Sequence, residues 1–107
     1  MDLTLSEEHT MLRESAAAFV DKEVVPHAAE WDRTEEVDRG IVAKLGDAGL
    51  MGLGVPEELG GSGGDMFAYA LAIEELGRGD QAIRGIVSVS LGLVAKSIVA
   101  WGTDEQK

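Results

Sequence analysis

Arg84 is the charged residue in this sequence whose position most strongly suggests ligand binding. It stands near the start of a long apolar segment, Gln81 to Trp101. A buried guanidinium group needs a carboxylate or phosphate partner. In one interpretation the partner is structural and lies within the chain. In the other, Arg84 faces a pocket and binds the anionic part of a ligand. The structural candidates are Glu74, Glu75 and Asp80.

No other group of residues in the chain has the spacing of a catalytic or metal site. The two histidines, His9 and His27, are 18 residues apart, and neither belongs to a pair with metal-ligand spacing. No Gly-x-Ser-x-Gly motif occurs. Acidic residues often stand side by side, but adjacent residues of a helix do not face each other. We therefore expect no catalytic residue and no metal site, and we do not expect the chain to be a complete enzyme.

The segment from Leu50 to Asp65 holds six glycines and Pro56, which predicts a loop. A phosphate-binding loop of the P-loop type needs Lys followed by Ser or Thr after its glycines. Here Asp65 and Met66 follow, and a carboxylate at that place repels phosphate. The favoured interpretation is a tight connection that lets two helices pack.

Composition limits the class of protein. A chain of 107 residues suits one domain, and its 5% aromatic content favours a helical core built from aliphatic side chains. The net charge of −11 argues against binding to nucleic acid or to anionic lipid. There is no cysteine and no basic segment followed by an apolar run at the N-terminus. The expected location is the cytoplasm, or the mitochondrial matrix if the protein is eukaryotic.

Hydrophobic periodicity and capping residues predict four helices with a Gly-rich loop between the second and third, an all-α bundle. The first starts at a Ser6 cap, and Pro26 should kink or break it near Val25. In the second, Asp38 can cap the start and Gly49 the end. The third should be buried, because it is apolar nearly all round. The predicted ranges are Ser6 to Trp31, Asp38 to Ala48, Met66 to Arg78 with Asp65 as its cap, and Gln81 to Trp101.

The fourth predicted helix is rich in apolar residues. Arg84 and Lys96 limit its uncharged stretch to Gly85 through Ala95, which is too short for a membrane span. We therefore expect the buried central helix of a bundle. Beyond it, Thr103 to Gln106 has the pattern of a capping box, which indicates the start of a further helix. This pattern favours a chain that is cut from a longer protein, the alternative being a frayed polar tail.

Several segments, taken in order, resemble the N-terminal helical domain of acyl-CoA dehydrogenases, and together they cover nearly the whole chain. Where the family has an aromatic residue, this chain has Leu59. The resembling segments are Leu5 to Arg13, Pro26 to Asp32, Leu45 to Leu53, Val55 to Gly61, Ile73 to Leu76 and Trp101 to Lys107.

The resemblance implies an enzyme that oxidises the Cα–Cβ bond of an acyl-CoA thioester, with a glutamate base and FAD as hydride acceptor. In this family a middle β-domain and a C-terminal helical domain carry most of the FAD contacts and usually the base. Residues 1–107 would form only the N-terminal domain, so no catalytic or cofactor-binding residue is assigned, and FAD should not be held by this chain alone. The resemblance also implies a homo-oligomeric parent, with electron-transfer flavoprotein as a partner.

The family's N-terminal domain supplies one wall of the acyl pocket. Ile83, Val87 and Leu91 recur every four residues and could form that wall or belong to the core. In members similar to glutaryl-CoA dehydrogenase, an arginine at the place of Arg84 pairs with the distal carboxylate of the substrate. Ser88 stands one helical turn further, although Gly85 replaces the serine that follows the arginine in those members. The hypothesis is a dicarboxylyl or otherwise polar short acyl-CoA.

A competing hypothesis is a stand-alone helical module for binding or assembly, with no catalytic activity. The apolar fourth helix and the capping box at Thr103 both favour the enzyme domain. The helix would need further polypeptide to cover it, and the capping box would need further polypeptide to form a helix.

Overall fold

The structure, a computed structural model, describes residues 1–107, and its regular elements are all helices. The predicted all-α class is confirmed, and the nearest approach to a sheet is an isolated parallel bridge between Leu53 and Gly63. The elements are α1 (Glu7–Phe19), η1 (Val20–Val24), α2 (Val25–Thr34), α3 (Gly40–Asp47), η2 (Glu57–Leu59), α4 (Met66–Gly79), α5 (Gln81–Val87), η3 (Ser88–Ala95) and α6 (Lys96–Trp101).

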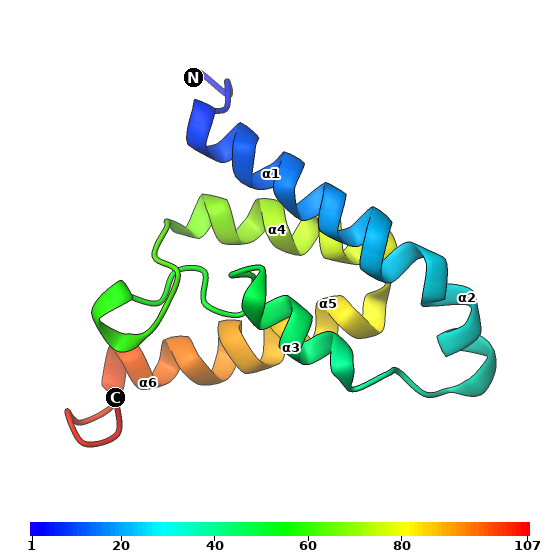
Figure 1. The fold of residues 1–107 in the computed structure, drawn as a ribbon. Coiled ribbons are helices and arrows are strands. Elements are labelled where there is room, and N and C mark those ends of the chain that lie inside the picture. The colour runs from blue at the N-terminus through cyan, green and yellow to red at the C-terminus, as the bar shows by residue number, and fades with distance from the viewer.

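The helices form four longer rods, and two of them make a hairpin. Helix α4 runs one way, and the continuous run of α5, η3 and α6, hereafter the fourth helix, returns beside it (Figure 1). Helix α1 lies along α4 on the side away from α6, as Figure 1 shows. The molecule is flat, with extents of 42 × 38 × 22 Å. A flat arrangement of few helices leaves a large part of each helix uncovered.

The first rod runs without a break from α1 through α2, and Pro26 is accommodated by a widened turn. The predicted disturbance near Val25 is the π-helical segment Val20–Val24, immediately before α2. A π-helical turn shifts the hydrogen-bond pattern by one residue, so the missing N–H of the proline does not end the helix. The rod ends at Thr34, three residues beyond the predicted Trp31.

The second rod, α3, is shorter than predicted at its start. It begins at Gly40, where the Asp38 carboxylate accepts a hydrogen bond from the Gly40 N–H at 3.0 Å. At its end Gly49 adopts the left-handed conformation, with φ of 76°. Gly49 therefore ends the helix as predicted, whereas the N-cap residue is Arg39 rather than Asp38, and the helix lies inside the predicted range.

The glycine-rich segment is an ordered loop. The N–H groups of Gly54 and Gly63 donate to the carbonyls of Gly63 and Val55 at 2.7 and 2.9 Å. Gly61 lies so close to the Val55 carbonyl that any side chain there would collide with it. Leu53 and Val55 are buried beneath the loop. This arrangement agrees with the tight-connection interpretation.

The third rod, α4, starts at Met66 as predicted, with Asp65 as its cap. The Ala68 N–H donates to the Asp65 carboxylate at 2.7 Å. The prediction that α4 is buried nearly all round is wrong at its start, where Met66 and Phe67 are 64% and 48% exposed. One side of that first turn has no neighbouring helix. The buried residues of α4 are Ala68, Leu71, Ala72 and Leu76.

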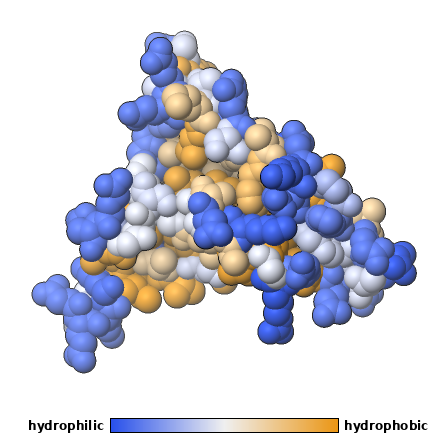
Figure 2. Space-filling view, viewed as in Figure 1, coloured by the Kyte–Doolittle hydropathy of each residue, from blue (hydrophilic) through white to orange (hydrophobic).

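The fourth helix is not the buried central helix that the sequence predicts. Only Ile83, Val87 and Leu91 are buried, a single stripe with a spacing of four residues. The opposite face is apolar but open to solvent, and Figure 2 shows apolar side chains along the edge formed by α6. Other helices pack against this helix on one side only, so its other side stays exposed and the prediction of a fully buried helix fails. The exposed residues are Val89, Leu93, Val94, Ile98 and Trp101.

By length and composition alone, the fourth helix could cross a membrane. It has 21 residues, and the mean hydropathy of its most apolar 18-residue window is 1.7. This criterion tolerates the two charged residues that the sequence argument counts against a span, and core helices of soluble proteins meet it as well. Its buried stripe nonetheless belongs to the core that all four rods share.

The capping box after the fourth helix is confirmed. The Thr103 N–H donates to the Gln106 side-chain oxygen at 2.9 Å, and the Gln106 N–H donates to the Thr103 hydroxyl at 3.3 Å. The residues between them form a turn. The geometry is that of a first helical turn.

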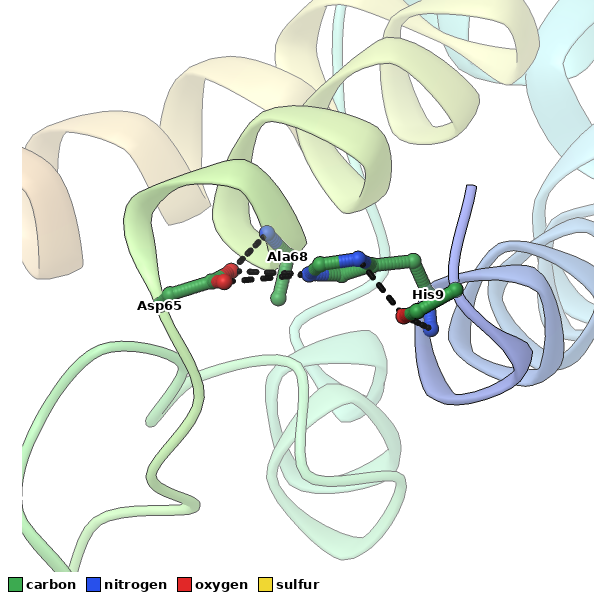
Figure 3. Close-up of polar contacts among 4 residues, drawn as sticks. His9, Asp65 and Ala68 are labelled. Atoms are coloured by element: carbon green, nitrogen blue, oxygen red, sulfur yellow. Dashed lines mark hydrogen bonds and ion pairs between the residues drawn. The ribbon is translucent and has the colours of Figure 1, made fainter. Parts of the chain in front are cut away.

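A network of polar contacts ties the start of α1 to the start of α4 (Figure 3). The His9 ring lies between Ser6 and Asp65, with its Nε2 3.0 and 3.1 Å from the two carboxylate oxygens. Since a carboxylate only accepts, Nε2 donates, and Nδ1 can accept from the Ser6 hydroxyl at 2.8 Å. The Ala68 N–H and the His9 ring together hold the pKa of Asp65 below its ordinary value.

We predict that Asp65→Asn lowers stability at neutral pH and that the deficit shrinks in acid. A carboxyl group with a lowered pKa stabilises the folded state above its ordinary pKa, and this contribution is lost as pH falls through the lowered value. The urea midpoints of wild type and variant should differ at about pH 7 and converge towards about pH 3. Asp104→Asn is the control, because Asp104 makes no side-chain hydrogen bond. An unchanged deficit at both pH values would contradict the assignment.

Gly79 allows the end of α4 to contact the π-helical segment of the first rod. A Cβ at Gly79 would lie 2.5 Å from Val20 Cγ1 and 3.1 Å from Val24 Cγ1, both in buried side chains. At Gly77, two residues earlier, the nearest atom would be Arg84 Cγ at 3.6 Å, an ordinary contact.

We predict opposite effects for alanine at these two glycines. Gly79→Ala should lower the free energy of unfolding by about 1–3 kcal/mol, because the packed valines must shift. Gly77→Ala should raise it by about 0.5–1 kcal/mol, the usual gain from replacing glycine inside a helix. Urea denaturation of the two variants measures both values. Similar stability for both would show that Gly79 has no packing role.

Candidate functional site

Arg84 forms no ion pair with any carboxylate of the chain. Its Nε donates to the Gln81 side chain at 3.0 Å, and its Nη1 donates to the Ser88 hydroxyl at 3.3 Å. The proposed structural partners are engaged elsewhere or distant: Glu75 pairs with Arg78, and Asp80 caps α5. The predicted ion pair of Arg84 with Glu74, Glu75 or Asp80 is therefore wrong. A half-buried guanidinium group is left with neutral partners only.

Beyond Ser88, a groove separates α4 from the fourth helix. Its volume is about 260 Å³. Gly92 forms its floor, where the Tyr69 hydroxyl lies so close that a side chain at position 92 would collide with it. The lining residues are Met66, Tyr69, Ser88, Gly92, Leu93 and Lys96. The groove is thus mostly apolar, with a hydroxyl group at one end and an ammonium group at the other.

Lys96 packs into the groove rather than extending into solvent. Its ammonium nitrogen lies 3.8 Å from the centroid of the Tyr69 ring and 3.6 Å from the Met66 sulfur. It forms no ion pair, and burial lowers the pKa of Lys96. Lys44 is the contrasting case, because its ion pair with Glu23 raises the pKa of Lys44.

Of the five residues predicted to bind substrate, the structure brings two to the groove and places three elsewhere. Ser88 lines the groove, and Arg84 contacts Ser88 from the next turn. Ile83, Val87 and Leu91 are at most 1% exposed and belong to the hydrophobic core, which was the alternative considered for them.

Sequence reasoning missed five residues of the groove: Met66, Tyr69, Gly92, Leu93 and Lys96. Gly92 and Lys96 continue the four-residue spacing of Arg84 and Ser88, so the row was visible in the sequence. Met66 and Tyr69 belong to α4, and only the pairing of the two helices shows that they face this row.

No hollow on this chain fits a complete flavin dinucleotide. Sites for ligands of that size usually measure about 300–1,000 Å³ and are largely apolar, with a few positioned polar groups. The groove is smaller, and a larger hollow of about 460 Å³ is lined chiefly by polar residues between Trp31 and Arg39. At the start of α4, where phosphate could bind, the Asp65 carboxylate accepts from the Ala68 N–H and would repel an anion. No cluster of side chains suits a metal ion.

The residues of the groove can bind and position a ligand. An apolar lining accepts a short hydrocarbon chain, and the guanidinium group of Arg84 with the Ser88 hydroxyl can hold a carboxylate. No base is placed beside these groups: the groove lining contains no carboxylate and no histidine.

Comparison with known proteins identifies relatives of this chain. A probable acyl-CoA dehydrogenase of Bacillus subtilis is 44% identical over 100% of this chain, which spans 28% of that relative. The relatives also include mitochondrial short-chain specific enzymes of mammals. This chain is therefore similar to about a quarter of each relative's length.

Solved structures show the same helices. A structure described as the electron transferring flavoprotein of Acidaminococcus fermentans superposes with a TM-score of 0.95 at 39% identity, covering 99% of this chain and 28% of that one. A glutaryl-CoA dehydrogenase from Mycobacterium smegmatis gives a TM-score of 0.91 at 37% identity, covering 97% and 27%.

The family assignment itself comes from a model of the acyl-CoA dehydrogenase N-terminal domain, which matches residues 6–107. It favours the enzyme domain over the stand-alone helical module. The chain therefore belongs to the acyl-CoA dehydrogenase family, as its N-terminal helical domain.

Proposed function

We propose that this domain forms one wall of the acyl site of a flavin-dependent acyl-CoA dehydrogenase and that the groove beside Ser88 takes a short acyl chain. The observation that carries the proposal is Arg84, a half-buried cation without a carboxylate partner at the end of an apolar groove. A cation in that position is stabilised by an anion that arrives with the ligand.

The anion that fits is a distal carboxylate on the acyl group, as in a dicarboxylyl thioester. The planar guanidinium group of Arg84 can bind it through two N–H donors, and the Ser88 hydroxyl, 3.3 Å from Nη1, can add a third. A glutaryl-CoA dehydrogenase is among the similar structures, beside relatives described as short-chain specific, so the preference for a dicarboxylyl group rests on Arg84.

Ile83, Val87 and Leu91 support the site in this proposal without being open to ligand. Their burial fixes the rotation of the fourth helix, and this rotation directs Arg84 and Ser88 away from the core. Their contribution to the acyl wall would be indirect: they hold the fourth helix in the position that presents Arg84 and Ser88.

Other parts of the enzyme would complete the site. FAD and the catalytic base are expected on polypeptide outside residues 1–107, since no hollow here fits the cofactor. The active protein would be a homo-oligomer that passes electrons to an electron-transfer flavoprotein. We place it in the cytoplasm, or in the mitochondrial matrix of a eukaryote, since the mammalian relatives are described as mitochondrial.

The test is substrate selectivity in the longer enzyme that carries this domain. We predict that Arg84→Ala lowers kcat/KM for glutaryl-CoA by about 10–100-fold, the loss expected when a charge-assisted hydrogen bond is removed. Butyryl-CoA has no distal carboxylate, so its kcat/KM should change by less than about threefold. Steady-state assays with both substrates give the ratio.

Two further variants sharpen this test. Arg33→Ala removes an exposed arginine of α2 that pairs only with Glu30, and it should leave both substrates unaffected. Ser88→Ala should reduce activity on glutaryl-CoA by a smaller factor than Arg84→Ala. Equal losses on glutaryl-CoA and butyryl-CoA in Arg84→Ala would contradict recognition of a distal carboxylate.

A further inference from the structure

The four lysines of the chain lie in different surroundings. Lys22 and Lys107 are exposed, and Lys44 is held by Glu23 with its Nζ 2.7 Å from a carboxylate oxygen. Lys96 alone lines a groove, with its ammonium nitrogen over the Tyr69 ring and next to the Met66 sulfur. Its surroundings are those of an amine held at the edge of an apolar cleft.

These surroundings raise the neutral fraction of the amine above that of a lysine in open solvent. Burial raises the free energy of a charged group, and no carboxylate offsets that cost at Lys96, where the pKa is lowered accordingly. The Tyr69 ring attracts the cation, but a ring face is a weaker partner than a carboxylate. Only the neutral form of an amine has the lone pair that attacks a carbonyl carbon.

We propose that Lys96 is a site of spontaneous Nε-acylation by acyl thioesters that enter the groove. The lone pair of Nζ attacks the thioester carbonyl carbon and forms a C–N bond. The C–S bond then breaks, and the thiolate leaves and is protonated by the hydrogen that the nitrogen releases. The products are an amide and a free thiol, so no oxidant or reductant is needed.

The proposal goes beyond the dehydrogenase role: it rests on the groove accepting an acyl thioester, as proposed above, but not on oxidation of the acyl chain. A thioester carbonyl that reaches the groove meets the amine whether or not oxidation of the acyl chain follows. Acylation would remove the positive charge from the end of the groove, and the new amide would replace the ammonium group between Tyr69 and Met66. A neutral, longer side chain would narrow the groove, so the modified domain would bind acyl groups less well.

Competition among the lysines of one chain tests the proposal. The 107-residue chain is incubated with acetyl-CoA at about pH 8, and peptide mass spectrometry follows acetylation at each lysine. Lys96 should react at least about threefold faster than Lys22, because a lowered pKa enlarges the neutral fraction more than it weakens the nucleophile. Lys44 should be slower still, since its ion pair holds the proton. Acetylation of Lys96 no faster than that of Lys22 would overturn the proposal.

A matched pair of variants at Met66 tests whether the absence of a nearby carboxylate causes the faster acetylation of Lys96. Met66 is 64% exposed and opens α4, where an acidic side chain is favourable, so both variants should fold, and circular dichroism checks this. Met66→Glu places a carboxylate beside the amine and should slow Lys96 acetylation to the rate of Lys44. Met66→Gln has the same shape without charge and should stay within about twofold of wild type. Equal rates in both variants would contradict the role assigned to the missing carboxylate.

Discussion

The fourth helix depends on three buried side chains, and the rest of the structure follows from that stripe. Ile83, Val87 and Leu91 anchor the helix in the core shared by all four rods. Burying one stripe of a helix fixes its rotation, and each neighbouring row of residues then has a defined position. The row that contains Ser88 and Lys96 faces α4 and closes the groove. The opposite face is left uncovered.

This constraint separates two kinds of surface on one helix. On the groove side, Gly92 lets the Tyr69 hydroxyl approach, and two cations, Arg84 and Lys96, lie without carboxylate partners. On the far side the surface is apolar, with Val94 and Trp101 53% and 89% exposed. A patch of that kind usually marks a surface covered by another part of a protein. Family membership, with this chain spanning about a quarter of its relatives, agrees with that interpretation.

Local chemistry was predictable from the sequence, and burial was not. Ser6, Asp65 and the Thr103 capping box act as predicted, because a cap depends on residues within one turn. The exposure of the fourth helix was missed, because it depends on how many helices surround it. The Arg84 interpretation failed in part for the same reason: the sequence offered Glu75 as a partner, but only the folded chain shows that Arg78 takes it. Tyr69 likewise joins the groove through helix pairing alone.

The central claim is that this domain supplies a wall of an acyl site whose flavin is held elsewhere in the enzyme. The most direct test is size-exclusion chromatography of the 107-residue chain with added FAD, with an absorbance spectrum recorded across each peak. The account predicts that the protein peak is colourless and that the flavin elutes separately, because no hollow here fits the dinucleotide. A yellow protein peak of defined size would mean that these helices build a flavin site themselves, and would contradict the account.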